Sequence, residues 1–96
     1  MDAADIDDLL SRLKEIEELV QFPGVEGHLK RTETLALSIA RKAPGTASHL
    51  AMHVVSEAIA LRPGALPIVA SDAKLRTMLR DLRTALEDAR RTSATR

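Results

Sequence analysis

The chain has 96 residues, in which 14 basic side chains balance 14 acidic ones, with one phenylalanine as the single aromatic residue and no cysteine. This length predicts a single domain over residues 1–96 that buries a modest core without a metal ion or a disulfide. The lack of cysteine excludes a disulfide framework and a thiolate metal site, and it suits a reducing cytoplasm. A core of Leu, Ile, Val, Ala and Met favours an all-α fold.

Charge is balanced overall but divided unevenly along the chain. Residues 1–20 carry seven acidic and two basic side chains, whereas residues 71–96 carry seven basic and four acidic ones. Because opposite charges attract, we expect the two terminal helices to lie side by side. The acidic beginning of the chain is unlike a cationic signal peptide, and no apolar run approaches the roughly 20 residues that span a bilayer. We therefore expect a cytoplasmic protein that does not insert into a membrane.

Three Pro-Gly dipeptides, the first at Pro23-Gly24, divide the chain into four segments of helical length. Proline cannot continue a helix, and glycine readily adopts the left-handed backbone that ends one. The sequence therefore predicts a small four-helix bundle with short Pro-Gly turns and a frayed tail at residues 92–96. The predicted helices span about residues 3–21, 25–42, 46–61 and 71–91.

The two terminal segments each carry a narrow apolar stripe. In the first segment, apolar residues alternate in steps of three and four, as in a coiled-coil seam: Ile6, Leu9, Leu13, Ile16 and Val20. The last segment carries a similar stripe: Leu75, Met78, Leu79, Leu82, Leu86 and Ala89. About two heptads are too few for a free-standing coiled coil, so each seam must pack against another helix.

The segment at 46–61 is the least charged of the four, with Glu57 as its one formal charge. At about 100° per residue, its apolar residues cover an arc of about 200°: Ala47, Leu50, Ala51, Met52, Val54, Val55, Ala58, Ile59 and Leu61. An arc this wide is typical of a helix covered on several sides, so we predict that this third helix is central in the bundle. Thr46 is the predicted N-cap of this helix, and Ser71 that of the next.

An apolar connection precedes the last helix: Leu66, Pro67, Ile68, Val69 and Ala70. Solvated loops are usually polar, so we expect this segment to fold over an open end of the bundle. The alternative is an exposed patch that binds a partner.

Two histidines and a glutamate form the polar strip of the third helix. His49 and His53 are four residues apart, and Glu57 lies one turn further on. Imidazoles at this spacing can bind a divalent metal ion, for which His28 would have to supply a third nitrogen. The sequence favours a solvated or partner-facing strip instead, because paired histidines arise often on exposed helix faces. His28 itself is interpreted as a packed residue in the first turn of its helix.

A row of arginines follows the apolar stripe of the last helix: Arg76, Arg80, Arg83 and Arg90. Such a row can bind phosphates, but acidic residues are interspersed and this helix offers no aromatic residue for base stacking. We expect these arginines to pair with the acidic first helix, in the same chain or in a second copy.

No pattern of a catalytic or cofactor site is present in the sequence. It contains neither a strained-turn nucleophile motif nor a phosphate-binding glycine loop, so we expect no enzymatic activity and no cofactor. The sequence favours a small protein–protein interaction module that regulates, links or inhibits a larger assembly and self-associates through its first and last helices. The alternatives are nucleic-acid binding through the arginine row, and an acidic first helix that mimics nucleic acid. The candidate partner-binding residues are Arg76, Arg80, Arg83, Arg90, His49, His53 and Glu57.

Overall fold

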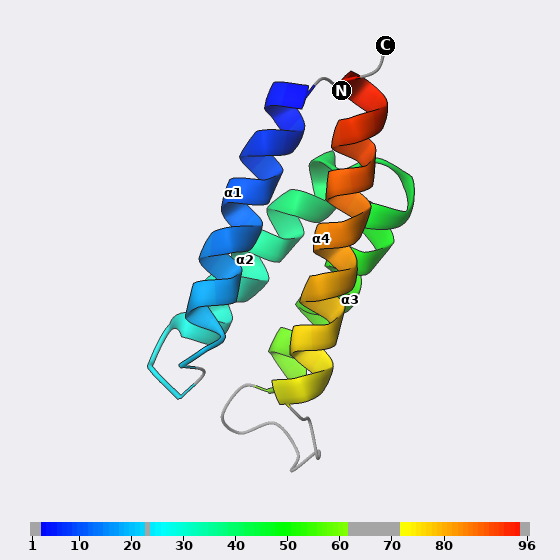
Figure 1. Cartoon of the computed structure of the whole chain (residues 1–96). Helices are drawn as coiled ribbons and strands as arrows, with labels where there is room; N and C mark the ends of the chain where they lie inside the picture. The colour runs from blue at the N-terminus through cyan, green and yellow to red at the C-terminus, as the bar shows by residue number, and fades with distance from the viewer. Residues whose placement is uncertain (1–2, 23, 62–71, 95–96) are drawn as a thin grey trace.

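The computed structural model describes residues 3–22, 24–61 and 72–94. Within these ranges it contains four helices and no strand, which confirms the predicted all-α four-helix bundle (Figure 1). Its helices are α1 (Ala3–Leu19), α2 (His28–Lys42), α3 (Gly45–Ala60) and α4 (Asp72–Ala94). The predicted cap Ser71, the turn at Pro63-Gly64 and the apolar connection at residues 66–70 lie outside the described residues.

The four helices pack in a ring of neighbours. Helix α1 packs against α2 and α4, and α3 packs against the same two helices. The first turn of α1 and the last turn of α4 lie at the same end of the bundle, so the terminal helices run antiparallel beside each other (Figure 1). This arrangement confirms the expectation drawn from their opposite charges.

The seams of α1 and α4 supply the large side chains of the core. The predicted seam residues of α1 from Ile6 to Ile16 are at most 1% exposed, and the buried leucines of α4 at most 2%. Steps of three and four residues keep these side chains on one face of each helix. The fully buried seam residues are Ile6, Leu9, Leu13, Ile16, Leu75, Leu79, Leu82 and Leu86.

Helices α2 and α3 bury several alanines beside larger side chains such as Leu35, Ile39 and Val54. The buried alanines of α2 are Ala36 and Ala40, and α3 buries Ala47, Ala51 and Ala58. Small side chains let two helix backbones approach closely. The Ser48 hydroxyl donates a hydrogen bond to the Ala40 carbonyl oxygen at 2.7 Å, which joins the first turn of α3 directly to the backbone of α2.

The exposed edge of α3 differs from the sequence prediction. Met52 and Ile59, which belong to the predicted apolar arc, are 42% and 46% exposed. The buried part of the arc is therefore narrower than predicted, because α2 and α4 cover α3 on two sides. Among the described helices, α3 has two neighbours like each of the others, so it is not the central helix that the sequence predicted. Thr46 is also not the N-cap: Pro44 takes that position, and no side chain caps the helix.

The start of α2 and the end of α4 each depart from the predicted bounds by three residues, and α1 ends at Leu19, before the predicted residue 21. Helix α2 begins at His28 and not at residue 25, because Gly27 before it adopts a left-handed backbone with φ of 87°. That conformation interrupts a right-handed helix and favours glycine. Helix α4 continues to Ala94, beyond the predicted end at residue 91.

Candidate functional site

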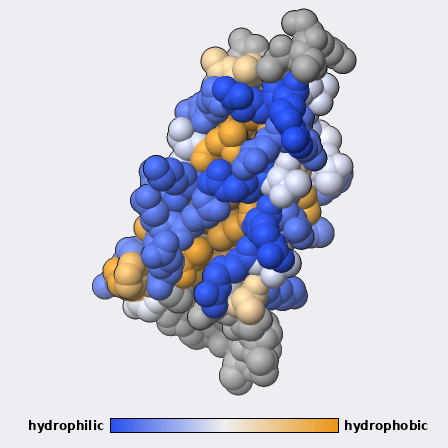
Figure 2. Space-filling model, in the orientation of Figure 1, coloured by the Kyte–Doolittle hydropathy of each residue, from blue (hydrophilic) through white to orange (hydrophobic). Residues whose placement is uncertain are grey.

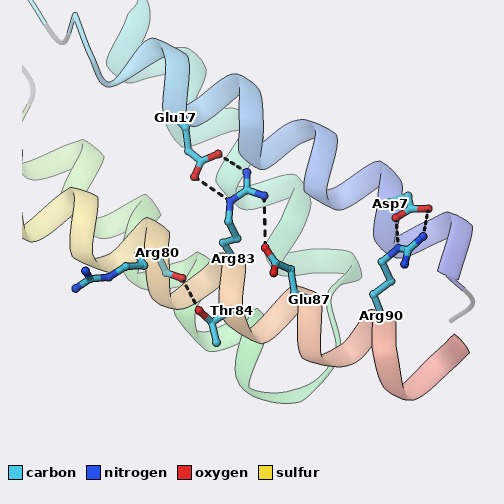
Figure 3. A network of polar contacts seen from close by, with 7 residues as sticks. All are labelled: Asp7, Glu17, Arg80, Arg83, Thr84, Glu87 and Arg90. Atoms are coloured by element: carbon cyan, nitrogen blue, oxygen red, sulfur yellow. Dashed lines mark hydrogen bonds and ion pairs between the residues drawn. The ribbon is translucent and has the colours of Figure 1, made fainter. Parts of the chain in front are cut away.

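The contact between α1 and α4 is bridged by an ion pair near the C-terminal end of α1. The Nε of Arg83 donates a hydrogen bond to Oε2 of Glu17 at 3.1 Å, and its Nη2 donates to Oε1 of the same carboxylate (Figure 3). Nη1 of Arg83 also lies 3.7 Å from Oε1 of Glu87, one turn further along α4. Two parallel hydrogen bonds of this kind are the strongest arrangement of an arginine on a carboxylate.

These contacts hold Arg83 in its charged form. The hydrogen bonds with Glu17 are the main cause that raises the pKa of Arg83 above the ordinary arginine value, while partial burial acts in the opposite direction. The Coulombic attraction of Glu17 and Glu87 adds to the increase. Arg83 is therefore a permanent cation whose charge is compensated within the chain.

A second ion pair joins the same two helices near the chain ends. The Nη2 of Arg90 donates to Oδ2 of Asp7 at 3.4 Å, and its Nε donates to Oδ1 (Figure 3). The hydrogen bonds with Asp7 are the main cause that raises the pKa of Arg90. Two members of the predicted arginine row thus bind carboxylates of α1, which confirms that α4 pairs with the acidic first helix within one chain.

Between the two helices, beside the Glu17–Arg83 pair, the surface is hollowed into a pocket of about 340 Å³. Two buried seam residues contribute to its lining, Val20 at 9% exposed and Leu79 at 2%. Figure 2 shows apolar surface along the boundary between α1 and α4, bordered by hydrophilic residues. We call this pocket the α1–α4 groove; it is lined by Glu17, Val20, Gln21, Arg76, Leu79, Arg80 and Arg83.

The groove combines apolar side chains with charged ones. Three arginines line it against the single carboxylate of Glu17, which is already bound to Arg83. Within the described part of the chain, the Arg80 guanidinium makes no hydrogen bond or ion pair. Its side chain points away from the Glu17–Arg83 pair (Figure 3). Arg80 is therefore available to bind an anionic group presented next to Val20 and Leu79.

The polar strip of α3 is divided in the structure. His49 and His53 are exposed, whereas Glu57, interpreted from the sequence as part of the same strip, is 8% exposed. Oε2 of Glu57 lies 3.6 Å from Nζ of Lys74, so this carboxylate faces α4. Glu57 therefore lies on the edge of α3 that α4 covers. This position corrects the prediction that Glu57 faces a partner.

No group of three or more metal-binding side chains occurs among the residues that the structure describes. The metal-binding hypothesis requires His28 to supply a third nitrogen ligand. In the structure, Nδ1 of His28 lies 3.1 Å from the carbonyl oxygen of Leu19. This contact ties the start of α2 to the end of α1 and confirms the interpretation of His28 as a packed residue.

Several acidic residues of α1 are already bound to arginines. One of them is Asp7, which binds Arg90. Oδ2 of Asp8 lies 2.9 Å from Nη2 of Arg12 on the same helix. Oε2 of Glu15 lies 2.9 Å from Nε of Arg31 on α2. The acidic surface considered as a nucleic-acid mimic is thus partly neutralised by the chain itself. Asp2, another of its members, lies outside the described residues.

Sequence reasoning did not single out Glu17 or Gln21, and it assigned Val20 and Leu79 to the core alone. A signal for Glu17 was present, since it directly follows the seam residue Ile16 and so lies beside the face that meets the basic helix. The groove itself depends on how far apart the two backbones lie, which no sequence pattern states.

None of the helices within the described ranges is long and apolar enough to cross a membrane. Comparisons of the chain with protein-family models, with curated proteins and with solved structures gave no match. Inference about function therefore depends on the surface of the chain, and above all on the α1–α4 groove.

Proposed function

We propose that this protein is a small non-catalytic protein–protein interaction module that regulates, links or inhibits a larger assembly in the cytoplasm. The observation that supports this proposal is the α1–α4 groove, which places an apolar floor beside exposed arginines. Protein interfaces combine an apolar centre with a polar rim, and arginine is enriched among the residues that dominate their binding energy.

Part of the groove is already ordered in the absence of a partner. Leu79 belongs to the buried seam of α4, and Arg83 is bound in place by Glu17 from the opposite helix. A surface that is already ordered loses little conformational entropy when it binds. An apolar side chain of the partner would lie on Val20 and Leu79, and the rim would bind the polar groups around it.

Self-association is a second candidate for the same surface. The seams of α1 and α4, which the sequence suggested as the interface, are buried within one chain. A second copy would therefore use the outer faces, where the exposed Glu18 of α1 can offer a carboxylate to the groove of its neighbour. Light scattering over a range of concentrations tests this. A mass that rises toward a dimer supports it, and a constant monomer mass leaves a different protein as the partner.

Nucleic-acid binding through the arginine row has less support. Phosphate contacts by a row of arginines require free guanidinium groups, whereas Arg83 and Arg90 are bound to carboxylates of α1. A mobility-shift assay at low salt checks this alternative, since binding that weakens steeply with added salt would favour it over a protein partner.

Affinity capture with matched charge variants tests the main proposal. We expect a host protein to be retained by the wild type and by Arg41→Gln, and to be lost with Arg80→Gln. Both arginines are exposed, but Arg41 lies in the last turn of α2 and not in the groove. Binding is then measured with the purified partner. If no protein binds the wild type specifically, the proposal is wrong.

A further inference from the structure

We infer that the α1–α4 groove binds an acidic peptide segment of its partner, in which an apolar side chain is flanked by carboxylates. This inference rests on the proposed function and specifies the chemistry of the partner. The inference is supported by the size of the groove, by its apolar lining residues, and by which of its arginines are bound to carboxylates of the same chain.

The floor selects an apolar group. Val20 and Leu79 are 9% and 2% exposed, and of the described residues they are the two aliphatic ones that line a pocket of about 340 Å³. This volume is at the low end of the range of about 300–1,000 Å³ found for ligand pockets. The groove therefore has room for an anchoring side chain and the groups beside it, and a branched aliphatic side chain matches the floor.

The charge of the rim selects a carboxylate beside that anchor. Glu17 and Glu87 already compensate Arg83, while Arg80 makes no side-chain hydrogen bond or ion pair in the part of the chain that is described. Arg76 lines the groove one turn before Arg80. A peptide carboxylate would bind Arg80 as the Glu17 carboxylate binds Arg83, through charge-assisted hydrogen bonds.

The composition of the lining favours a peptide over a nucleic acid. None of the seven described lining residues is aromatic, so an unpaired base would find no ring on which to stack. Binding a nucleic-acid backbone also requires several adjacent cationic side chains that are not already paired. Arg83 and Arg90, however, form ion pairs with Glu17 and Asp7. An apolar floor with one available arginine matches an acidic and apolar peptide better.

Fluorescence anisotropy with defined peptides tests this inference on the intact chain. The probe is a labelled helical peptide with leucines along one face and glutamates beside them, and its control carries lysine in place of every glutamate. We expect saturable binding of the acidic peptide to the wild type and to Arg41→Gln, no binding of the lysine peptide, and a loss of affinity of about tenfold with Arg80→Gln. Circular dichroism confirms that each variant is folded.

Four results would overturn the inference: no saturable binding of the acidic peptide, equal binding of the lysine peptide, unchanged affinity in Arg80→Gln, or tighter binding of a labelled single-stranded oligonucleotide. The capture experiment separates this failure from failure of the proposed function. A host protein retained equally by Arg80→Gln and Arg41→Gln would leave the interaction module intact and reject the groove as its acidic-peptide site. If the acidic peptide binds but no host protein is captured, the groove would be supported as an acidic-peptide site and the proposed interaction module would be rejected.

Discussion

Two of the helix contacts in this bundle are built by different means. Between α2 and α3, both of which bury alanines, the Ser48 hydroxyl donates a hydrogen bond to the Ala40 carbonyl oxygen. Between α1 and α4, large aliphatic side chains form the seam, and the ion pairs Glu17–Arg83 and Asp7–Arg90 bridge its flank. The closely packed interface joins helices adjacent in sequence, whereas the charged interface joins the two ends of the chain.

This difference explains where the groove lies. Long side chains hold two helices further apart than alanines do, and arginines that reach across such a contact leave space between them. The α1–α4 groove lies on the charged interface, beside the Glu17–Arg83 pair. We infer that the bundle gains its tightest packing on one side and its binding surface on the other.

The largest expected effect is loss of the α1–α4 seam. Leu82 is fully buried in that seam, so Leu82→Ala should lower the free energy of unfolding by about 3 kcal/mol, because it removes apolar contacts and leaves a cavity. Urea unfolding measures this. As a control, Met52→Ala at an exposed position should change stability by less than about 0.5 kcal/mol. Equal effects of the two substitutions would show that α1 and α4 do not pack as described.

A smaller loss is expected from overfilling the α2–α3 interface. Ala51 is fully buried, and Ala51→Leu should destabilise the chain by about 2 kcal/mol, because a tightly packed contact cannot admit a larger side chain without strain. Thermal and urea unfolding should agree on this loss. Ala4→Leu, at an exposed position of α1, is the matched control and should be nearly neutral. If Ala51→Leu is stable, the close approach of these helices is wrong.

The smallest expected effect on stability concerns the ion pairs. Arg83 and Glu17 are 35% and 33% exposed, so Arg83→Gln should cost at most about 1 kcal/mol, with a smaller cost at higher salt. Arg90→Gln should cost less, because that pair is more exposed. A larger loss for Arg90→Gln than for Arg83→Gln would contradict this order.

The raised pKa of Arg83 also fixes the sign of its pH dependence. A group whose pKa is higher in the folded state contributes its full stability below the unfolded pKa and loses it as the pH rises through the folded value. For an arginine this window lies at very alkaline pH. The stability difference between Arg83→Gln and the wild type that arises from the arginine charge should therefore stay constant from pH 6 to pH 9, because the pKa of an arginine lies far above this range.

The sequence predicted the seams because helical periodicity alone places Ile6 and Leu82 on one face of their helices. It did not predict which edge of an apolar arc a neighbour would cover, so Glu57 and Met52 were assigned to the wrong environments. Arg80 and Arg83 belong to the same row in sequence, and only the register of α4 against α1 decides which of them meets Glu17. The groove depends on that register and on the distance between backbones, so it was not predictable from the sequence.

The most direct test of the α1–α4 groove as the binding surface is nuclear magnetic resonance mapping of the acidic peptide on the isotope-labelled chain. We predict that the amide signals of Val20, Leu79 and Arg80 shift on titration, while those of Met52 and Ile59, the exposed apolar residues of α3, do not. Shifts centred on Met52 and Ile59 would contradict the account, because they would place the binding surface on the outer face of α3.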